Sequence, residues 1–174
     1  MYKVFGQMDT EELNACAKGL REEGDNDRIR LLAKENGIPE FFADTYIETG
    51  EEFTDPMTAA MGKLDIEAAE YKNNQIPVEP IIDFLKAECT NEDFAVRVRH
   101  RTKSVQECMK KIEDNCKKIQ KDTGKHYVAD MVVFNWAKDY FKEAQSDAKE
   151  RPVGASTYES NRRNAPGSRR NPKI

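Results

Sequence analysis

The sequence lacks the features that mark a membrane-spanning or exported protein. No apolar run approaches the roughly 20 residues needed to span a bilayer, and the mean hydropathy is −0.84. Residues 1–6 contain no long apolar stretch of the kind that a secretory signal needs. We therefore predict a cytoplasmic protein that has no membrane partner.

Patterns of metal ligands and catalytic residues are also scarce. None of the four cysteines forms a CxxC pair, and the only histidines are His100 and His126. Structural zinc sites usually take four Cys or His ligands at short spacings, and neither histidine lies in a known catalytic motif. We predict no metal, no cofactor and no enzymatic activity. A metal-dependent enzyme is a less favoured hypothesis, because paired carboxylates can assemble in three dimensions.

Charge is abundant but unevenly distributed along the chain. Residues 1–91 carry 9 Lys and Arg against 20 Asp and Glu, a net charge of −11, whereas residues 92–174 carry 19 against 12, a net charge of +7. Such a chain can present one face to basic partners and another to acidic ones. The simpler interpretation is that the two halves attract each other and are otherwise solvated.

Helical periodicity dominates the apolar pattern. Apolar residues recur at spacings of three and four, and they are interrupted by caps such as Asp9, Asp55 and Ser104 and by stops such as Gly50. We predict an all-α, or mainly α, fold: a small bundle of about six to eight helices with a C-terminal helical hairpin and a disordered tail. The predicted domains are an acidic helical domain at 1–75, a basic helical module at 76–145 and a disordered basic tail at 146–174.

Two helices carry the clearest apolar stripes. In the helix predicted over 55–73, the stripe is Met57, Ala60, Met61, Leu64, Ala68 and Tyr71, which is more typical of a core face than of a docking surface. The last helix, predicted over about 128–145, carries a wide apolar face around the only tryptophan, Trp136. We expect this face to pack against the helix that Ser104 begins.

The acidic half offers one cluster of candidate binding residues. Its helix–turn–helix-like segment, 25–50, has an acidic second helix, whereas a DNA-reading helix needs Arg, Lys, Asn or Gln toward the bases. We therefore predict a small protein-binding or packing unit in place of a DNA reader. The carboxylates on it and just after it could occupy a cationic groove meant for nucleic acid. The candidates are Asp44, Glu48, Glu51, Glu52 and Asp55.

The basic half offers a second cluster. The run 97–103 is dense in Arg and Lys, and the helix that follows carries further lysines on its polar side. These side chains are either a phosphate-tracking surface or an ordinary solvated face. The candidates for contact with nucleic acid or a partner are Arg97, Arg99, Arg101, Lys103, Lys110, Lys111, Lys117 and Lys118.

The last hairpin resembles a known module. The segments KSVQECMKKI and HYVADMVVFNWAKDYF, within residues 103–142, resemble the carboxy-terminal module of PcfK-like proteins of Firmicutes mobile elements, some of which are Cas9 inhibitors. The matching positions are Lys103, Ser104, Cys108, Asp130, Val133, Trp136, Ala137, Tyr140 and Phe141. The chain departs from the family at Lys138-Asp139, where relatives commonly carry an aliphatic residue and a His, and at Lys142-Glu143, where an acidic run often follows.

This resemblance implies an anti-CRISPR protein in the cytoplasm of a bacterial host. Such a protein would bind a CRISPR effector, Cas9 with its guide RNA, stoichiometrically and interfere with binding or cleavage of target DNA. The basic run supports an alternative hypothesis, a nucleic-acid-binding accessory protein of a conjugative plasmid or phage that contacts DNA or RNA directly.

Overall fold

The protein is all-α in the part of the chain that the structure, a computed structural model, describes: residues 1–72 and 76–143. These residues contain eight helices and no strand, as the sequence predicts. The tail predicted from residue 146 onward lies outside them. The helices are α1 (Thr10–Glu22), α2 (Asn26–Glu35), α3 (Glu40–Thr49), α4 (Pro56–Glu70), α5 (Glu79–Glu88), α6 (Glu92–Arg99), α7 (Val105–Thr123) and α8 (Asp130–Lys142).

Local caps set most of the helix ends. Asp9 and Glu12 form a capping box at the start of α1, in which each side chain accepts a hydrogen bond from the other residue's backbone N–H. Asp55 caps α4, with Pro56 in its first turn. Gly50 and Gly124 end α3 and α7 in the left-handed conformation, with φ of 73° and 71°, which glycine adopts without strain.

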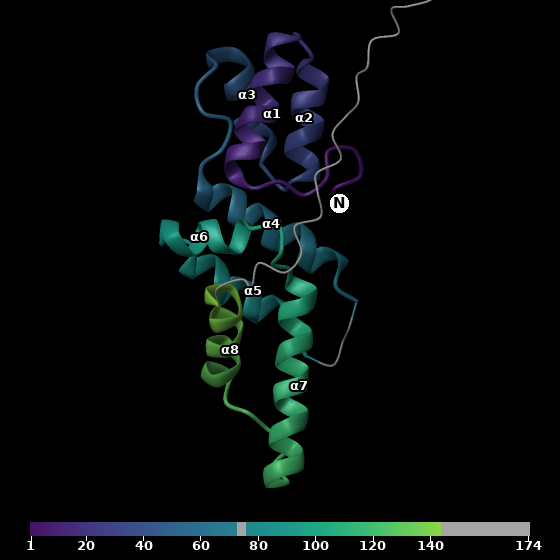
Figure 1. Cartoon of the computed structure of the whole chain (residues 1–174), viewed down its shortest axis with the longest axis vertical. Coiled ribbons are helices and arrows are strands. Elements are labelled where there is room, and N and C mark those ends of the chain that lie inside the picture. The colour runs from purple at the N-terminus through teal and green to yellow at the C-terminus, as the bar shows by residue number, and fades with distance from the viewer. Residues whose placement is uncertain (73–75, 144–174) are drawn as a thin grey trace, which may run out of the picture. The chain divides into compact units, whose positions relative to one another are not determined.

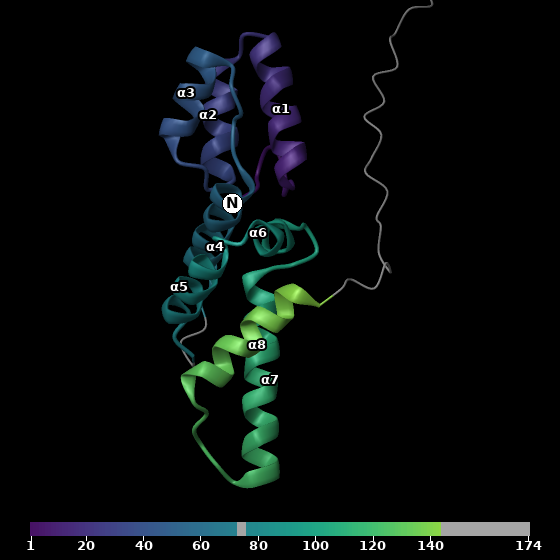
Figure 2. The same ribbon diagram turned by 90° about the vertical axis from the view of Figure 1, so that its left-hand side faces the viewer.

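The helices form two groups joined by α4. α1, α2 and α3 pack together around one cluster of buried residues that includes Leu13, Ile29 and Phe53. α4 to α8 surround a second cluster that includes Leu85, Met109 and Phe141. Figures 1 and 2 show α4, α5 and α6 between the first three helices and the α7–α8 hairpin.

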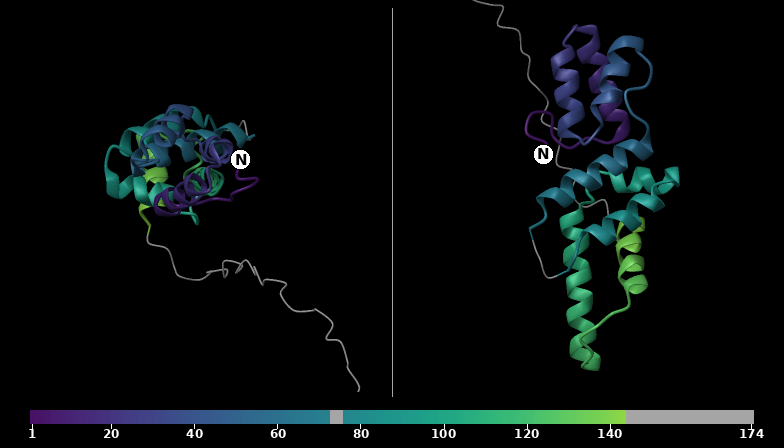
Figure 3. Two further views of the ribbon diagram at one scale, coloured as in Figure 1. Left: turned by 90° about the horizontal axis from the view of Figure 1, so that it is seen from above. Right: turned by 180° about the vertical axis from the view of Figure 1, so that it is seen from behind.

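The two clusters meet inside α4. Ala59 belongs to the first cluster and Ala60 to the second, and all of Met1–Ala144 forms one compact unit. The view from behind in Figure 3 shows α4 crossing below α1–α3. α4 therefore contributes residues to both hydrophobic clusters. The predicted domain boundary near residue 75 remains a prediction.

The α4 stripe differs from the predicted one. Met57 is exposed, whereas Gly62, Lys63 and Glu67 are buried in addition to Ala60 and Leu64. α5, α6 and α7 all pack against α4, so burial extends beyond one apolar stripe to charged positions. The helix also ends at Glu70, before the predicted residue 73.

Candidate functional site

The predicted acidic cluster divides into exposed and structural residues. Glu48, at the end of α3, and Glu51 and Glu52, in the following loop, are exposed. No Lys or Arg forms an ion pair with these three carboxylates within the described chain. They are therefore the members of the cluster that remain available to a partner.

The other two acidic candidates are already used within the fold. Asp44 accepts a hydrogen bond from Arg30 Nε at 2.8 Å. Asp55 accepts hydrogen bonds from the backbone N–H and hydroxyl of Thr58, at 2.9 and 2.6 Å. Burial alone would raise the pKa of Asp55, but these hydrogen bonds outweigh it and lower the pKa. Asp55 fixes the start of α4, whereas the half-exposed pair of Asp44 with Arg30 joins α3 to α2 only weakly.

Asn14, which sequence reasoning missed, holds the loop that carries Glu51 and Glu52. Its side-chain oxygen accepts from the N–H groups of Phe53 and Thr54 at 3.0 and 3.1 Å, and its nitrogen donates to the Thr54 carbonyl at 2.8 Å. Phe53 is fully buried, with its ring centre 5.6 Å from that of Tyr46. The loop is thus pinned to α1 and α3. An Asn inside a helix pattern gives only a weak signal of such a role.

An exposed aromatic side chain accompanies the acidic residues on α3. Phe41 is 73% exposed, and it lies three residues before Asp44 and seven before Glu48, so the three share one side of the helix. Residues 1–55, named here the acidic end, carry 6 Lys and Arg against 14 Asp and Glu, a net charge of −8. Lys18 and Arg21 line the same hollow as Glu51 and Glu52, so the field there is partly neutralised.

Two of the basic candidates lie inside the protein, which corrects the prediction that they form a surface. Arg99 is fully buried, and Lys103 is 8% exposed. Lys103 Nζ donates to the Tyr140 carbonyl at 2.6 Å and lies 4.6 Å from the centre of the Tyr140 ring. Neither side chain can reach a phosphate.

Three further basic candidates are engaged in contacts at the surface. Arg97 donates to the Lys142 carbonyl at 3.0 Å, Arg101 pairs with Glu12, and Lys111 pairs with Glu143. Exposed ion pairs of this kind contribute little stability and can exchange partners. The remaining basic candidates, which are exposed and have no ion pair within the described residues, are Lys110, Lys117 and Lys118.

Arg99 is the centre of a buried polar junction formed by Asn36, Lys63, Glu67 and Arg99. Its guanidinium donates to the carbonyls of Met8 and Ala59, at 2.8 and 3.2 Å, and to the Asn36 side-chain oxygen at 2.6 Å. It thus joins the segment before α1 to α2, α4 and α6. Burial lowers the pKa of Arg99, but a guanidinium stays charged in proteins.

Lys63 is the second buried cation of this junction. Its Nζ donates to the carbonyls of His100 and Lys103 at 2.8 and 2.6 Å and lies 3.9 Å from Glu67. Burial lowers the pKa of Lys63 to about 7. Glu67 in turn accepts from the Val105 N–H at 2.8 Å and from the Tyr2 hydroxyl at 3.2 Å. Lys63 and Arg99 are fully buried, so the junction organises the fold, whereas Glu67 and Tyr2 also line a hollow at the surface.

The described residues contain no candidate metal centre. No three His, Cys, Asp or Glu side chains there lie close enough together to hold a metal ion. Burial lowers the pKa of His100, as do the nearby positive charges of Lys63 and Arg101. Within the same residues, no helix combines the length and apolar character needed to cross a membrane.

Comparison with known proteins identifies no relative: no family model, curated protein or solved structure matches the chain. The resemblance of residues 103–142 to PcfK-like proteins therefore remains a prediction. The exposed charged surfaces of the described residues are the features from which function can be argued.

Proposed function

We propose that this protein is an anti-CRISPR inhibitor that binds the complex of Cas9 with its guide RNA stoichiometrically and blocks the entry of target DNA. The proposal combines the hairpin resemblance with the charge of the acidic end. The observation that carries it is the exposed acidic surface of α3 and its following loop. A rigid surface of this charge complements a channel lined with Lys and Arg.

The position of Phe41 supports a protein partner over free cations. Aromatic side chains supply much of the energy at protein interfaces when a partner pocket buries them, and surrounding polar residues exclude water. Phe41 is such a side chain, and Glu40 and Glu48 lie on either side of it along the exposed surface of α3. Charged residues at the rim then mainly accelerate encounter with a basic partner.

A charge-removal series tests the proposal. The variant E48Q/E51Q/E52Q removes three exposed carboxylates and preserves their shape. The control D83N/D93N/D139N removes three exposed carboxylates from α5, α6 and α8. Purified Cas9–guide complex is titrated with each protein, and cleavage of target DNA and co-elution are measured. We expect the acidic-end variant to need about tenfold more protein for half-inhibition, which corresponds to about 1.4 kcal/mol, and the control to match wild type.

Two outcomes would contradict the proposal. Wild-type protein that neither co-elutes with the complex nor slows cleavage at micromolar concentration removes Cas9 as the partner. Equal losses in the two triple variants would show that net charge, and not the acidic end, is responsible. The substitution F41A, compared with V96A at an exposed apolar residue of α6, separates an apolar anchor from general surface polarity.

A further inference from the structure

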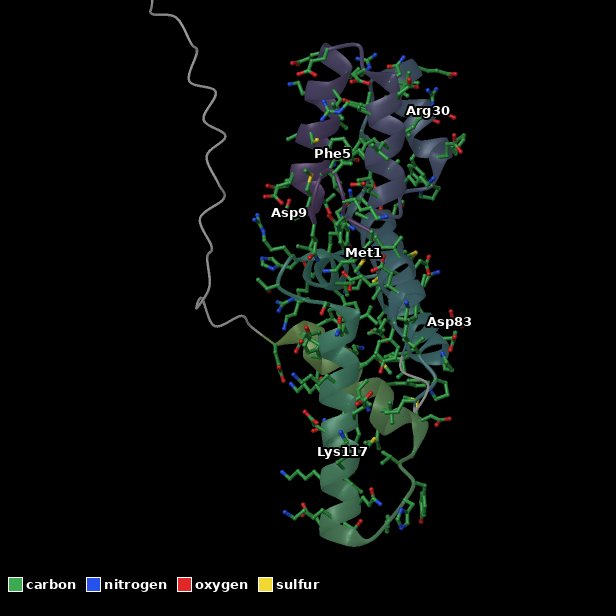
Figure 4. All side chains as sticks on the ribbon, turned by 90° about the vertical axis from the view of Figure 1, so that its right-hand side faces the viewer. Met1, Phe5, Asp9, Arg30, Asp83 and Lys117 are labelled. Atoms are coloured by element: carbon green, nitrogen blue, oxygen red, sulfur yellow. The ribbon has the colours of Figure 1, made fainter. Side chains whose placement is uncertain are left out.

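The free basic charge of the described chain is concentrated at the end of the α7–α8 hairpin. Residues 117–127 carry four lysines and one acidic residue, Asp122, a net charge of +3. All four lysines are exposed, and none forms an ion pair within the described residues. In Figure 4 Lys117 points away from α7, far from Arg30 on α2. The lysines are Lys117, Lys118, Lys121 and Lys125.

Helix stability explains only part of this arrangement. The C-terminal end of a helix carries partial negative charge, so a lysine in the last turn, such as Lys121, stabilises α7. Lys117 and Lys118 lie before that turn, and Lys125 follows the helix. The remaining lysines therefore have no such role within the fold.

A groove lies beside these lysines. It has a volume of about 680 Å³ and runs between α5, α7, the 124–129 linker and α8. Lys117 and Lys125 line it together with Gln120 and His126, whose side-chain nitrogens are 3.0 Å apart. Val133 and Phe134 are among its apolar walls. The volume lies in the usual range of small-molecule and cofactor sites, about 300 to 1,000 Å³, which suits a nucleobase.

Tyr127 supplies an aromatic surface at the same groove. It is 75% exposed, and it also lines the groove. An exposed ring between lysines is the combination on which single-stranded nucleic acids bind, because every base has a flat face that stacks and every linkage carries a negative charge.

Two acidic groups also line the groove, and they limit where phosphates can lie. Glu113 accepts a hydrogen bond from the Tyr71 hydroxyl at 2.9 Å. Asp130 lies in the first turn of α8, where negative charge stabilises the helix. We therefore place phosphates along the 117–125 side, away from both carboxylates.

We propose that the hairpin end, residues 117–127, binds single-stranded nucleic acid. Lys117, Lys118, Lys121 and Lys125 contact the phosphates, and one base stacks on Tyr127 at the mouth of the groove. Bases in a duplex are paired and stacked on each other, so only an unpaired strand offers a free base face to this ring. The site is separate from the acidic end, and it does not depend on the proposed inhibition of Cas9.

Fluorescence anisotropy with labelled 12-nucleotide oligo-dT, oligo-U and a 12-base-pair DNA duplex tests this site. The full chain is used throughout, so the arginines after residue 160 are constant. The variant K117Q/K118Q/K121Q/K125Q is compared with K3Q/K18Q/K34Q/K72Q, which removes four exposed lysines elsewhere. Three or four phosphate contacts predict a slope of about 2 to 3 for log Kd against log salt concentration, since each contact on a single strand contributes about 0.7. We expect that slope to flatten in the hairpin variant only.

Two substitutions of Tyr127 test the stacking contact. Y127A should weaken oligonucleotide binding about tenfold, in line with the loss of one base–aromatic stack, and Y127F should bind like wild type. F41A removes an equally exposed ring from α3 and should change nothing. Circular dichroism confirms that each variant is folded.

Several results would overturn the site. Equal weakening by the two lysine quadruples would assign binding to overall charge. Duplex binding as tight as oligo-dT binding, or unchanged binding by Y127A, would refute the stacking role of Tyr127. Absence of salt-sensitive binding by wild type at 50 mM salt would refute the whole surface.

Discussion

Replacing Arg99 with Met tests whether this arginine stabilises the fold or binds a partner. Met keeps much of the length of the apolar stem and removes every donor. The carbonyls of Met8 and Ala59 and the side-chain oxygen of Asn36 then lose their partner in an enclosed site. Hydrogen bonds to a charged group contribute about 1.5–3 kcal/mol each.

We therefore expect R99M to lower the free energy of unfolding by about 3–5 kcal/mol. This value is smaller than the sum for the three hydrogen bonds, because the variant no longer has to bury a charged guanidinium. For a chain of this size each kcal/mol lowers Tm by about 3–4 °C, so the melting temperature should fall by about 10–20 °C. Urea unfolding followed by circular dichroism and by Trp136 fluorescence measures the free energy of unfolding, and a temperature scan followed by circular dichroism measures Tm.

R97M provides the control for this prediction. Arg97 lies two residues earlier and is exposed, with one hydrogen bond to the Lys142 carbonyl. Its replacement should cost less than about 1 kcal/mol. If R99M melted within a few degrees of R97M, the buried polar junction would not contribute as argued here. If R99M instead stayed stable and lost binding to nucleic acid, the interpretation of Arg99 as a surface residue would be restored.

Three further perturbations address other parts of the fold. Burial lowers the pKa of Lys63 to about 7, so between pH 7 and its ordinary value near 10.5 the unfolded chain binds more protons. The burial of Lys63 therefore destabilises the fold fully below about pH 7 and less as the pH rises. The free energy of unfolding of wild type relative to that of K63M should increase by about 1 kcal/mol per pH unit from pH 7 to 9. A difference that does not change with pH would contradict this prediction. A Cβ at Gly62 would collide with the Gly37 carbonyl, whereas one at Gly19 meets nothing within 4 Å. In urea unfolding, G62A should therefore destabilise the protein by more than about 2 kcal/mol, whereas G19A should stabilise it by up to about 1 kcal/mol. Similar effects of the two substitutions would refute the close approach of Gly62 to Gly37. N14A should release the loop after α3 and lower the free energy of unfolding by about 2 kcal/mol. Amide hydrogen exchange at Phe53 and Thr54 should become faster. Unchanged exchange at these two residues would show that Asn14 does not hold the loop.

The sequence alone determined the helices and those of their ends that are set by local caps. The capping box of Asp9 and Glu12, the Asp55-Pro56 start and the stop at Gly50 each act within one helical turn. Such signals depend on neighbours along the chain, and they need no tertiary contact. The hairpin was predictable for a related reason, since the apolar faces of its two helices are each continuous and must be covered.

Only the tertiary structure decided which charges stay at the surface. Arg99 and Lys103 belong to a run that looks solvated, yet each turns inward to carbonyl groups that lie far away in the sequence. Lys63 and Glu67 are buried because three helices cover α4 beyond its apolar stripe. The periodic pattern of a sequence indicates which residues are apolar and which are charged. It does not indicate which backbone carbonyls in a distant segment lack a hydrogen-bond donor. Arg99 and Lys103 are buried because they donate hydrogen bonds to such distant carbonyls, so they are absent from the predicted basic surface. The lysines of the hairpin end have no such acceptors among the described residues and stay exposed.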